Sequence, residues 1–331
     1  MNTRIIKDFD NQIFETLENI KAKFSEYKDL IDSGLQNMSI EEFNDLKENI
    51  NTYLNIELAF FSDTYPTRLF RVTNNKYIVG EGKRLTKVSQ LIGPPEGLAK
   101  IGRCNLEGES VFYAALDFET AIWETQPEVG DNITVSVWKI KPGQKLDMHH
   151  VYHPKKTNLS KQAAESYKAS MKALPTMFGK IRDNNPELFD IIDEYYSFLT
   201  DEFMRKVSYD EKKNYLVSAL FSSRLLQSER DDNGFKIEAI SYPSVKREYG
   251  VTNVAIQNSL ALEKLDLEKI ILYEIGETNY TKEAKPNELI KVNGWQLEFD
   301  DFDFENDLII YDGQKEIEQV ADQHMKMMDE R

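Results

Sequence analysis

The first part of the chain alternates apolar and polar residues with the period of an α-helix. Two such runs flank Asp32-Ser33-Gly34, where a glycine can end a helix. Ser39 stands at the start of the second run and Glu42 follows at the spacing of a capping box. The apolar positions are Ile5, Phe9, Ile13, Leu17, Ile20 and Phe24 in the first run and Phe43, Leu46, Ile50 and Tyr53 in the second. Residues 1–60 are therefore predicted to form a helical hairpin.

Strand-like segments replace the helices after Tyr65-Pro66. Short apolar runs are bounded by turn residues, and a loop rich in proline and glycine between the first two runs can wrap closely around a ligand. Asp117 has the side chain of an N-cap. The predicted order is a strand at 68–73, a loop at 91–108, a strand at 110–115, a helix from Asp117 to Glu124 and a strand at 133–140.

Helical spacing returns in residues 158–229 and then gives way to strands. Asn293-Gly294 is a strong turn signal, because both residue types tolerate positive φ. The later elements are predicted as strands at 235–240 and 270–275, a hairpin of 288–292 with 295–299, and a tail or final helix at the end.

The intermingling of strands and helices predicts an α+β fold, with a mixed sheet and flanking helices rather than a doubly wound sheet. The helical hairpin is an addition at the N-terminus. The predicted domains are a helical region at 1–60, a catalytic-sized domain at 65–275 with a helical insertion near 155–210, and a C-terminal hairpin and tail at 276–331.

Composition narrows the classes of function. The formal net charge of -16 disfavours direct nucleic-acid binding, which draws its affinity from Lys and Arg. The single cysteine, Cys104, excludes an intrachain disulfide and is expected to be a small packed side chain. No apolar stretch has the length of a signal peptide core or a membrane span, so we expect a cytoplasmic protein that does not enter a membrane.

Three local patterns resemble known sites but lack residues that those sites require. Gly80-Glu81-Gly82 lacks the third glycine and the βαβ context of a dinucleotide fingerprint. His149, His150 and His153 lie beside Asp147, but they lack the pattern of a zinc protease, and we expect them at the surface or at a pocket rim. Residues 300–307 lack the glycine of an EF-hand loop and are expected to form an acidic edge. No metal site is predicted.

An ordered combination of short motifs remains. It runs Leu69-Phe70-Arg71-Val72, Gly102-Arg103-Cys104-Asn105, Val111-Phe112-Tyr113-Ala114-Ala115, Glu119-Thr120-Ala121-Ile122-Trp123-Glu124, Tyr242-Pro243-Ser244-Val245 and Asn253-Val254-Ala255. Taken in order over residues 65–275, these motifs resemble the RES family, named for its Arg, Glu and Ser. Where the family usually has Gly-Gly-Arg and an aromatic residue, this chain has Ile101-Gly102-Arg103-Cys104.

The resemblance implies an ADP-ribosyltransferase-like fold and cleavage of the bond between nicotinamide and ribose in NAD. Glu124 would stabilise the ribosyl oxocarbenium ion and hold a ribose hydroxyl. Arg71 and Arg103 would bind the two phosphates, since guanidinium groups match phosphate oxygens. Tyr113 would stack on nicotinamide, and Ser244 would hydrogen-bond near the ribose or amide. The implied catalytic residues are thus Glu124, Tyr113 and Arg71, and the substrate-binding residues are Arg71, Arg103, Tyr113 and Ser244.

Each assignment has a plain structural alternative. Glu124 could be a solvated helix residue, Tyr113 a core residue, and the two arginines partners in ion pairs, with Arg68 or Arg84 taking their role.

The resemblance implies NAD as substrate and no further cofactor. The acceptor of the ribosyl group is open between water, phosphate and a protein side chain. Family members are mostly toxins, so a separate antitoxin protein is an expected partner. The N-terminal helices are left open between homodimerisation, antitoxin contact and cover of the pocket. The alternatives are a protein ADP-ribosyltransferase and a catalytically silent interaction module.

Overall fold

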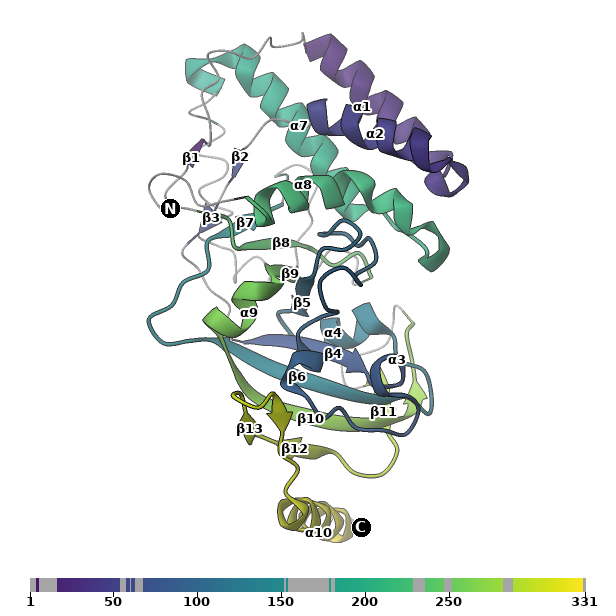
Figure 1. Cartoon of the computed structure of the whole chain (residues 1–331), viewed down its shortest axis with the longest axis vertical. Helices are drawn as coiled ribbons and strands as arrows, with labels where there is room; N and C mark the ends of the chain where they lie inside the picture. Colours follow the sequence, from purple (N-terminus) through teal and green to yellow (C-terminus); the bar gives the residue numbers. More distant parts are fainter. Residues whose placement is uncertain are drawn as a thin grey trace. The chain divides into compact units, whose positions relative to one another are not determined.

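The protein is α+β, as predicted, and its described residues fall into two compact units. The first unit takes residues 1–65, 94–111 and 145–257, and the second takes 66–93, 112–144 and 258–331. Figure 1 shows the computed structural model, which describes residues 4–5, 17–53, 58–59, 61–62, 68–151, 153, 179, 182–228, 236–246, 252–281 and 288–329.

Helices dominate the first unit. α1 packs on α7, and α2 packs on α8. Their bounds, with those of two 3-10 segments, are α1 (Leu17–Asp32), η2 (Leu35–Asn37), α2 (Ile40–Tyr53), α7 (Pro186–Met204), η4 (Tyr209–Tyr215) and α8 (Leu216–Leu226).

The predicted helical hairpin is confirmed over residues 17–53. Phe24 lies on the buried face of α1 and stacks on Phe198 of α7, with ring centroids 4.3 Å apart. The capping box is also confirmed: Glu42 N–H donates to Ser39 Oγ at 3.2 Å, and Ser39 N–H donates to Glu42 Oε2 at 2.8 Å. The prediction that the first helix begins near Ile5 is wrong, because α1 begins at Leu17.

That start is a strand instead. β1 (Arg4–Ile5) pairs antiparallel with β2 (Leu58–Ala59). The apolar positions Phe9 and Ile13 lie outside the described residues. Ile5 is extended because its backbone pairs with Leu58, which is distant in the sequence. The periodicity of apolar residues carries no information about such a distant partner.

The first unit also carries strands of both orientations. β8 (Ala239–Pro243) is antiparallel to β9 (Thr252–Gln257) and parallel to β7 (Met148–His150), which is antiparallel to β3 (Phe61–Ser62). All residues of β8 are buried, the polar Ser241 included. The strand predicted at 235–240 is thus present but shifted toward the C-terminus, at Ala239–Pro243.

An antiparallel sheet forms the second unit. Its strands lie in the order β11, β10, β6, β4, β5, and β12 also pairs with β10. The strands are β4 (Leu69–Asn74), β5 (Val111–Ala115), β6 (Asn132–Ile140), β10 (Leu265–Thr278), β11 (Ile290–Val292), β12 (Leu297–Phe299), β13 (Phe302–Asp303) and β14 (Leu308–Ile309). The helical segments are α3 (Lys76–Val79), η3 (Val88–Leu91), α4 (Phe118–Thr125), α9 (Asn258–Lys264) and α10 (Gly313–Asp329).

α4 covers one face of this sheet. Its Ile122 and Trp123 are buried in a cluster with the inward residues of β6 and β10, and Phe70 and Val72 of β4 pack against it. The alternation predicted for 133–140 is the cause, since Ile133, Val135 and Val137 all point to this face.

The hairpin predicted around Asn293-Gly294 is wrong. β11 and β12 do not pair with each other but lie in succession along the same strand, β10. Val292 pairs with Ile275 and Leu297 pairs with Leu272, so the intervening segment bulges out of the ladder. Gly294 still supplies the positive φ of 85° that made the turn signal.

The last residues form a helix, α10, which was one of the two predicted outcomes. Among the described residues no helix is both long and apolar enough to cross a membrane.

The N-cap of α4 gives a test of local stability. Asp117 accepts from Thr120 N–H at 2.7 Å and from Thr120 Oγ1 at 2.9 Å. Asp117→Ala should lower the free energy of unfolding by about 1–2 kcal/mol in urea titrations. Glu119→Gln, in the first turn of the same helix, is the control, and an equal loss in both variants would contradict the capping role.

Candidate functional site

Arg71 is the candidate residue with the most unusual surroundings. Its Nη1 donates to the backbone carbonyl of Tyr113 at 2.9 Å, and its guanidinium lies 5.6 Å from the centre of the Phe112 ring. Its Nε is enclosed and has no hydrogen-bond partner among the described residues. Burial lowers the pKa of Arg71 to about 10, which reflects a cation withdrawn from water.

The backbone explains how Arg71 comes to this place. β4 and β5 are paired at Phe70 and Ala115. One residue further along β4, the Arg71 side chain supplies the donor that meets the Tyr113 carbonyl. Because Phe70 and Val72 point toward the core under α4, Arg71 between them points to the opposite face of the sheet.

The arginines that compete with Arg71 for an anion are already in ion pairs. Arg68 makes two hydrogen bonds to Glu268, at 2.7 and 2.5 Å. Arg84 makes two to Glu316, at 2.9 and 2.8 Å. Of these three arginines, Arg71 is thus the one without a carboxylate partner among the described residues.

Tyr113 and Glu124 both belong to the second unit and are half-buried. Tyr113 lies in the middle of β5, between buried neighbours, so it is neither a full core residue nor a surface one. Glu124 lies in the last turn of α4, directly after the buried Trp123. The structure joins the Arg71 side chain to the backbone carbonyl of Tyr113. By alternation the Tyr113 side chain lies on the face of the sheet that α4, with Glu124, covers, whereas Arg71 points to the other face.

Arg103 belongs to the first unit and binds the end of a helix. Its guanidinium donates to the carbonyls of Phe203 and Arg205 at the C-terminus of α7, and it lies 4.7 Å from the centre of the Tyr215 ring. A cation is favoured here because the last carbonyls of a helix carry partial negative charge. This geometry supports a capping role, and phosphate binding by Arg103 stays a prediction.

Ser244 lies in the first unit, directly after β8, and is fully buried. Cys104 is also fully buried, as predicted, and burial raises the pKa of its thiol to about 12. A thiol with that pKa is a packed side chain and not a nucleophile at neutral pH.

The histidines are not where they were expected. His149, His150 and His153 are all at most 2% exposed, so their placement at the surface or at a pocket rim is wrong. His150 Nδ1 lies 2.8 Å from Ser241 Oγ, and His153 Nε2 lies 3.0 Å from Asp193 Oδ1. Among the described residues no group of three His, Cys, Asp or Glu side chains is placed to hold a metal ion.

Sequence reasoning missed Phe112. It was read as part of the motif around Tyr113, yet its ring packs edge-on against Trp138 at 5.4 Å and faces the Arg71 guanidinium. The alternation of β5 was the available signal, since it puts Phe112 and Tyr113 on opposite faces.

Comparison with known proteins bears on the same segment. A family model described as RES domain matches residues 68–274, more than half of the chain. No curated protein matches the chain. The matched segment contains Arg71, Arg103, Tyr113, Glu124 and Ser244.

The two arginines should respond differently to removal of their charge. Arg103→Met should lower the free energy of unfolding by about 1–3 kcal/mol, because buried helix carbonyls lose their donor. Arg71→Met should stay within about 1 kcal/mol of the natural protein, because it also removes a cation that burial disfavours. Urea titration of both variants checks this, and a larger loss for Arg71→Met would show that Arg71 is a structural residue.

The buried histidines predict a sensitivity to acid. Burial lowers the pKa of His149 and of His150 to about 3, below the value in an unfolded chain, so only the unfolded chain binds protons between about pH 6.5 and that value. Stability should be full above this window and fall on acidification, by at most about 1.4 kcal/mol per histidine per pH unit.

Urea titrations between about pH 7 and about pH 5 measure this slope. His149→Phe should reduce it, whereas His324→Gln, at an exposed position of α10, should not. An unchanged slope in His149→Phe would contradict the assignment.

Proposed function

Because this chain belongs to the RES domain family, we propose that it is an NAD-consuming enzyme that cleaves the bond between nicotinamide and ribose. The observation that carries the proposal is Arg71, a half-buried arginine without a carboxylate partner among the described residues, inside the matched segment. Such a cation destabilises the fold unless an anion meets it, and NAD carries a diphosphate.

Arg71 binds the diphosphate in this proposal. The hydrogen bond to the Tyr113 carbonyl and the ring of Phe112 fix its guanidinium, so that little side-chain entropy is lost on binding. A guanidinium held in this way can donate to two phosphate oxygens in parallel. Arg103 and Ser244 remain further proposed substrate-binding residues, on the ground of the family motifs that contain them.

Glu124 is the proposed catalytic carboxylate. The glycosidic C–N bond breaks, its electron pair goes to the pyridinium nitrogen, and neutral nicotinamide leaves a ribosyl oxocarbenium ion. A carboxylate beside the ribose stabilises this charge as it develops and holds a ribose hydroxyl. Tyr113, whose half-buried side chain lies by alternation on the face of the sheet that α4 covers, is the proposed stacking partner of nicotinamide.

Water is the simplest acceptor, and it gives ADP-ribose and a proton. Inorganic phosphate would give the phosphorolysis product instead. We further propose that NAD loss makes the protein a toxin in the cytoplasm, held in check by a separate antitoxin. NAD is the substrate in this scheme, and no other cofactor is needed.

Nicotinamide release measures the proposed activity. Purified full chain is incubated with NAD, with and without phosphate, and the products are separated by chromatography. We expect release that Glu124→Gln lowers by orders of magnitude, because the variant loses the charge and keeps the shape.

Glu119→Gln on the same helix is the matched control and should keep full turnover. Dependence on added phosphate separates phosphorolysis from hydrolysis. Equal turnover in Glu124→Gln and the natural protein would remove Glu124 from the mechanism. Absence of release would contradict hydrolysis and phosphorolysis and leave transfer to a protein as the reaction to test.

A further inference from the structure

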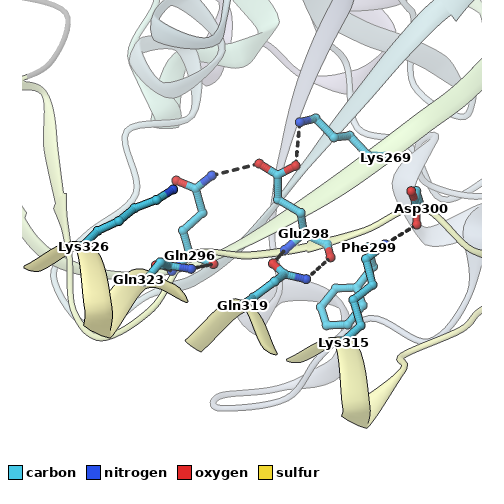
Figure 2. Close-up of a pocket in the computed structure, with 9 residues that line it drawn as sticks. All are labelled: Lys269, Gln296, Glu298, Phe299, Asp300, Lys315, Gln319, Gln323 and Lys326. Carbon is cyan, nitrogen blue, oxygen red and sulfur yellow. Dashed lines mark hydrogen bonds and ion pairs between the residues drawn. The ribbon is translucent and has the colours of Figure 1, made fainter. Parts of the chain in front are cut away.

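α10 is attached to the second unit by polar side chains. Gln319 and Gln323 lie one turn apart on the helix and face the outer edge of β12, as Figure 2 shows. Gln319 Oε1 accepts from Glu298 N–H and its Nε2 donates to the Glu298 carbonyl, both at 2.7 Å. Gln323 makes the same two bonds with the backbone of Gln296, at 3.2 and 2.6 Å.

This match follows from helix and strand dimensions. Residues four apart on a helix are separated by about 6 Å along its axis, and residues two apart on a strand by about 6.7 Å. Two glutamines at helical spacing can therefore take the place of a neighbouring strand along the outer edge of β12. An open edge would otherwise present unpaired N–H and C=O groups.

Ion pairs complete the attachment. Glu316 binds Arg84, and Lys315 binds Asp300. The space between the helix and the sheet holds a cavity of about 480 Å³, whose walls come from polar or charged residues apart from Phe299. These walls are Lys269, Gln296, Glu298, Phe299, Asp300, Lys315, Gln319, Gln323 and Lys326.

The large apolar residues of α10 are exposed, with the exception of the half-buried Val320. Ile317, Met325 and Met328 are 65%, 56% and 62% exposed, and Ala321 between them is exposed too. At about 100° per residue, these four positions share one stripe that lies about half a turn from Gln319 and Gln323. A helix on the surface of a domain usually has the opposite arrangement, with its apolar stripe toward the core.

Acidic residues border this stripe on one side. Glu318 and Asp322 are both exposed, one turn apart. The other border carries the partly exposed Met327. In an antiparallel pair of two copies, related by a twofold axis, the acidic borders would face each other, and a net charge of -16 further opposes self-association.

We propose that the outward stripe of α10, formed by Ile317, Ala321, Met325 and Met328, is a docking surface for another protein. The partner has an apolar groove with lysine or arginine side chains along the wall that meets Glu318 and Asp322. A helix laid in a groove is a common mode of recognition, and the apolar residues anchor it while the charges set its orientation. The inference stands independently of NAD chemistry.

Crosslinking identifies the partner and binding measurements test its chemistry. A benzophenone side chain is installed at Met325 of the full chain in cells of its native host, with one at the exposed Glu305 as control. The protein joined from Met325 and not from Glu305 is then purified, and its affinity for the full chain is measured at two salt concentrations.

We expect at least a tenfold loss of affinity in Ile317→Ser with Met325→Ser, and in Glu318→Lys with Asp322→Lys, together with weaker binding at high salt. These positions are exposed, so the variants should fold and keep the NAD turnover of the natural protein. A crosslink only to a second copy, no crosslink, or an affinity that these changes do not alter would overturn the proposal.

Discussion

The second unit holds an arginine, Arg71, that has no carboxylate partner among the described residues. Arg71 lies on a strand whose neighbours on either side, Phe70 and Val72, pack into the core under α4, so the pleat directs its guanidinium to the other face. There it meets a backbone carbonyl and an aromatic ring, which orient it without cancelling its charge. The proposed diphosphate of NAD would supply the negative charge that this arginine lacks among the described residues.

In the first unit, by contrast, the charge of Arg103 lies against the negative end of a helix. Arg103 satisfies the terminal carbonyls of α7, where helix and cation stabilise each other. The same residue type therefore has a structural role in the first unit and a proposed binding role in the second. Its surroundings, and not its position in a motif, distinguish the two uses.

The sequence predicted correctly those elements whose stabilising interactions join residues close together in the chain. The Ser39–Glu42 capping box, the Asp117 N-cap and the alternation of β6 were all readable, because each depends on residues close in the chain. The errors involve distant partners. β11 and β12 both pair with β10, Ile5 pairs with β2, and His149 and His150 are enclosed by α7, α8 and β8 residues such as Phe221 and Ser241. The family motifs located Arg71 and Tyr113, but only coordinates revealed Phe112 between Arg71 and Trp138.

The glutamine contacts of α10 also have a meaning for proteolysis and solubility. A cut in the segment that leads to this helix would release it and bare the outer rim of β12, with free backbone groups at Gln296 and Glu298. A bare rim recruits strands from other molecules into intermolecular ladders. Gln319 and Gln323 cover this edge with hydrogen bonds, which an apolar helix could not make. A carboxamide has the same N–H donor and C=O acceptor as a peptide group.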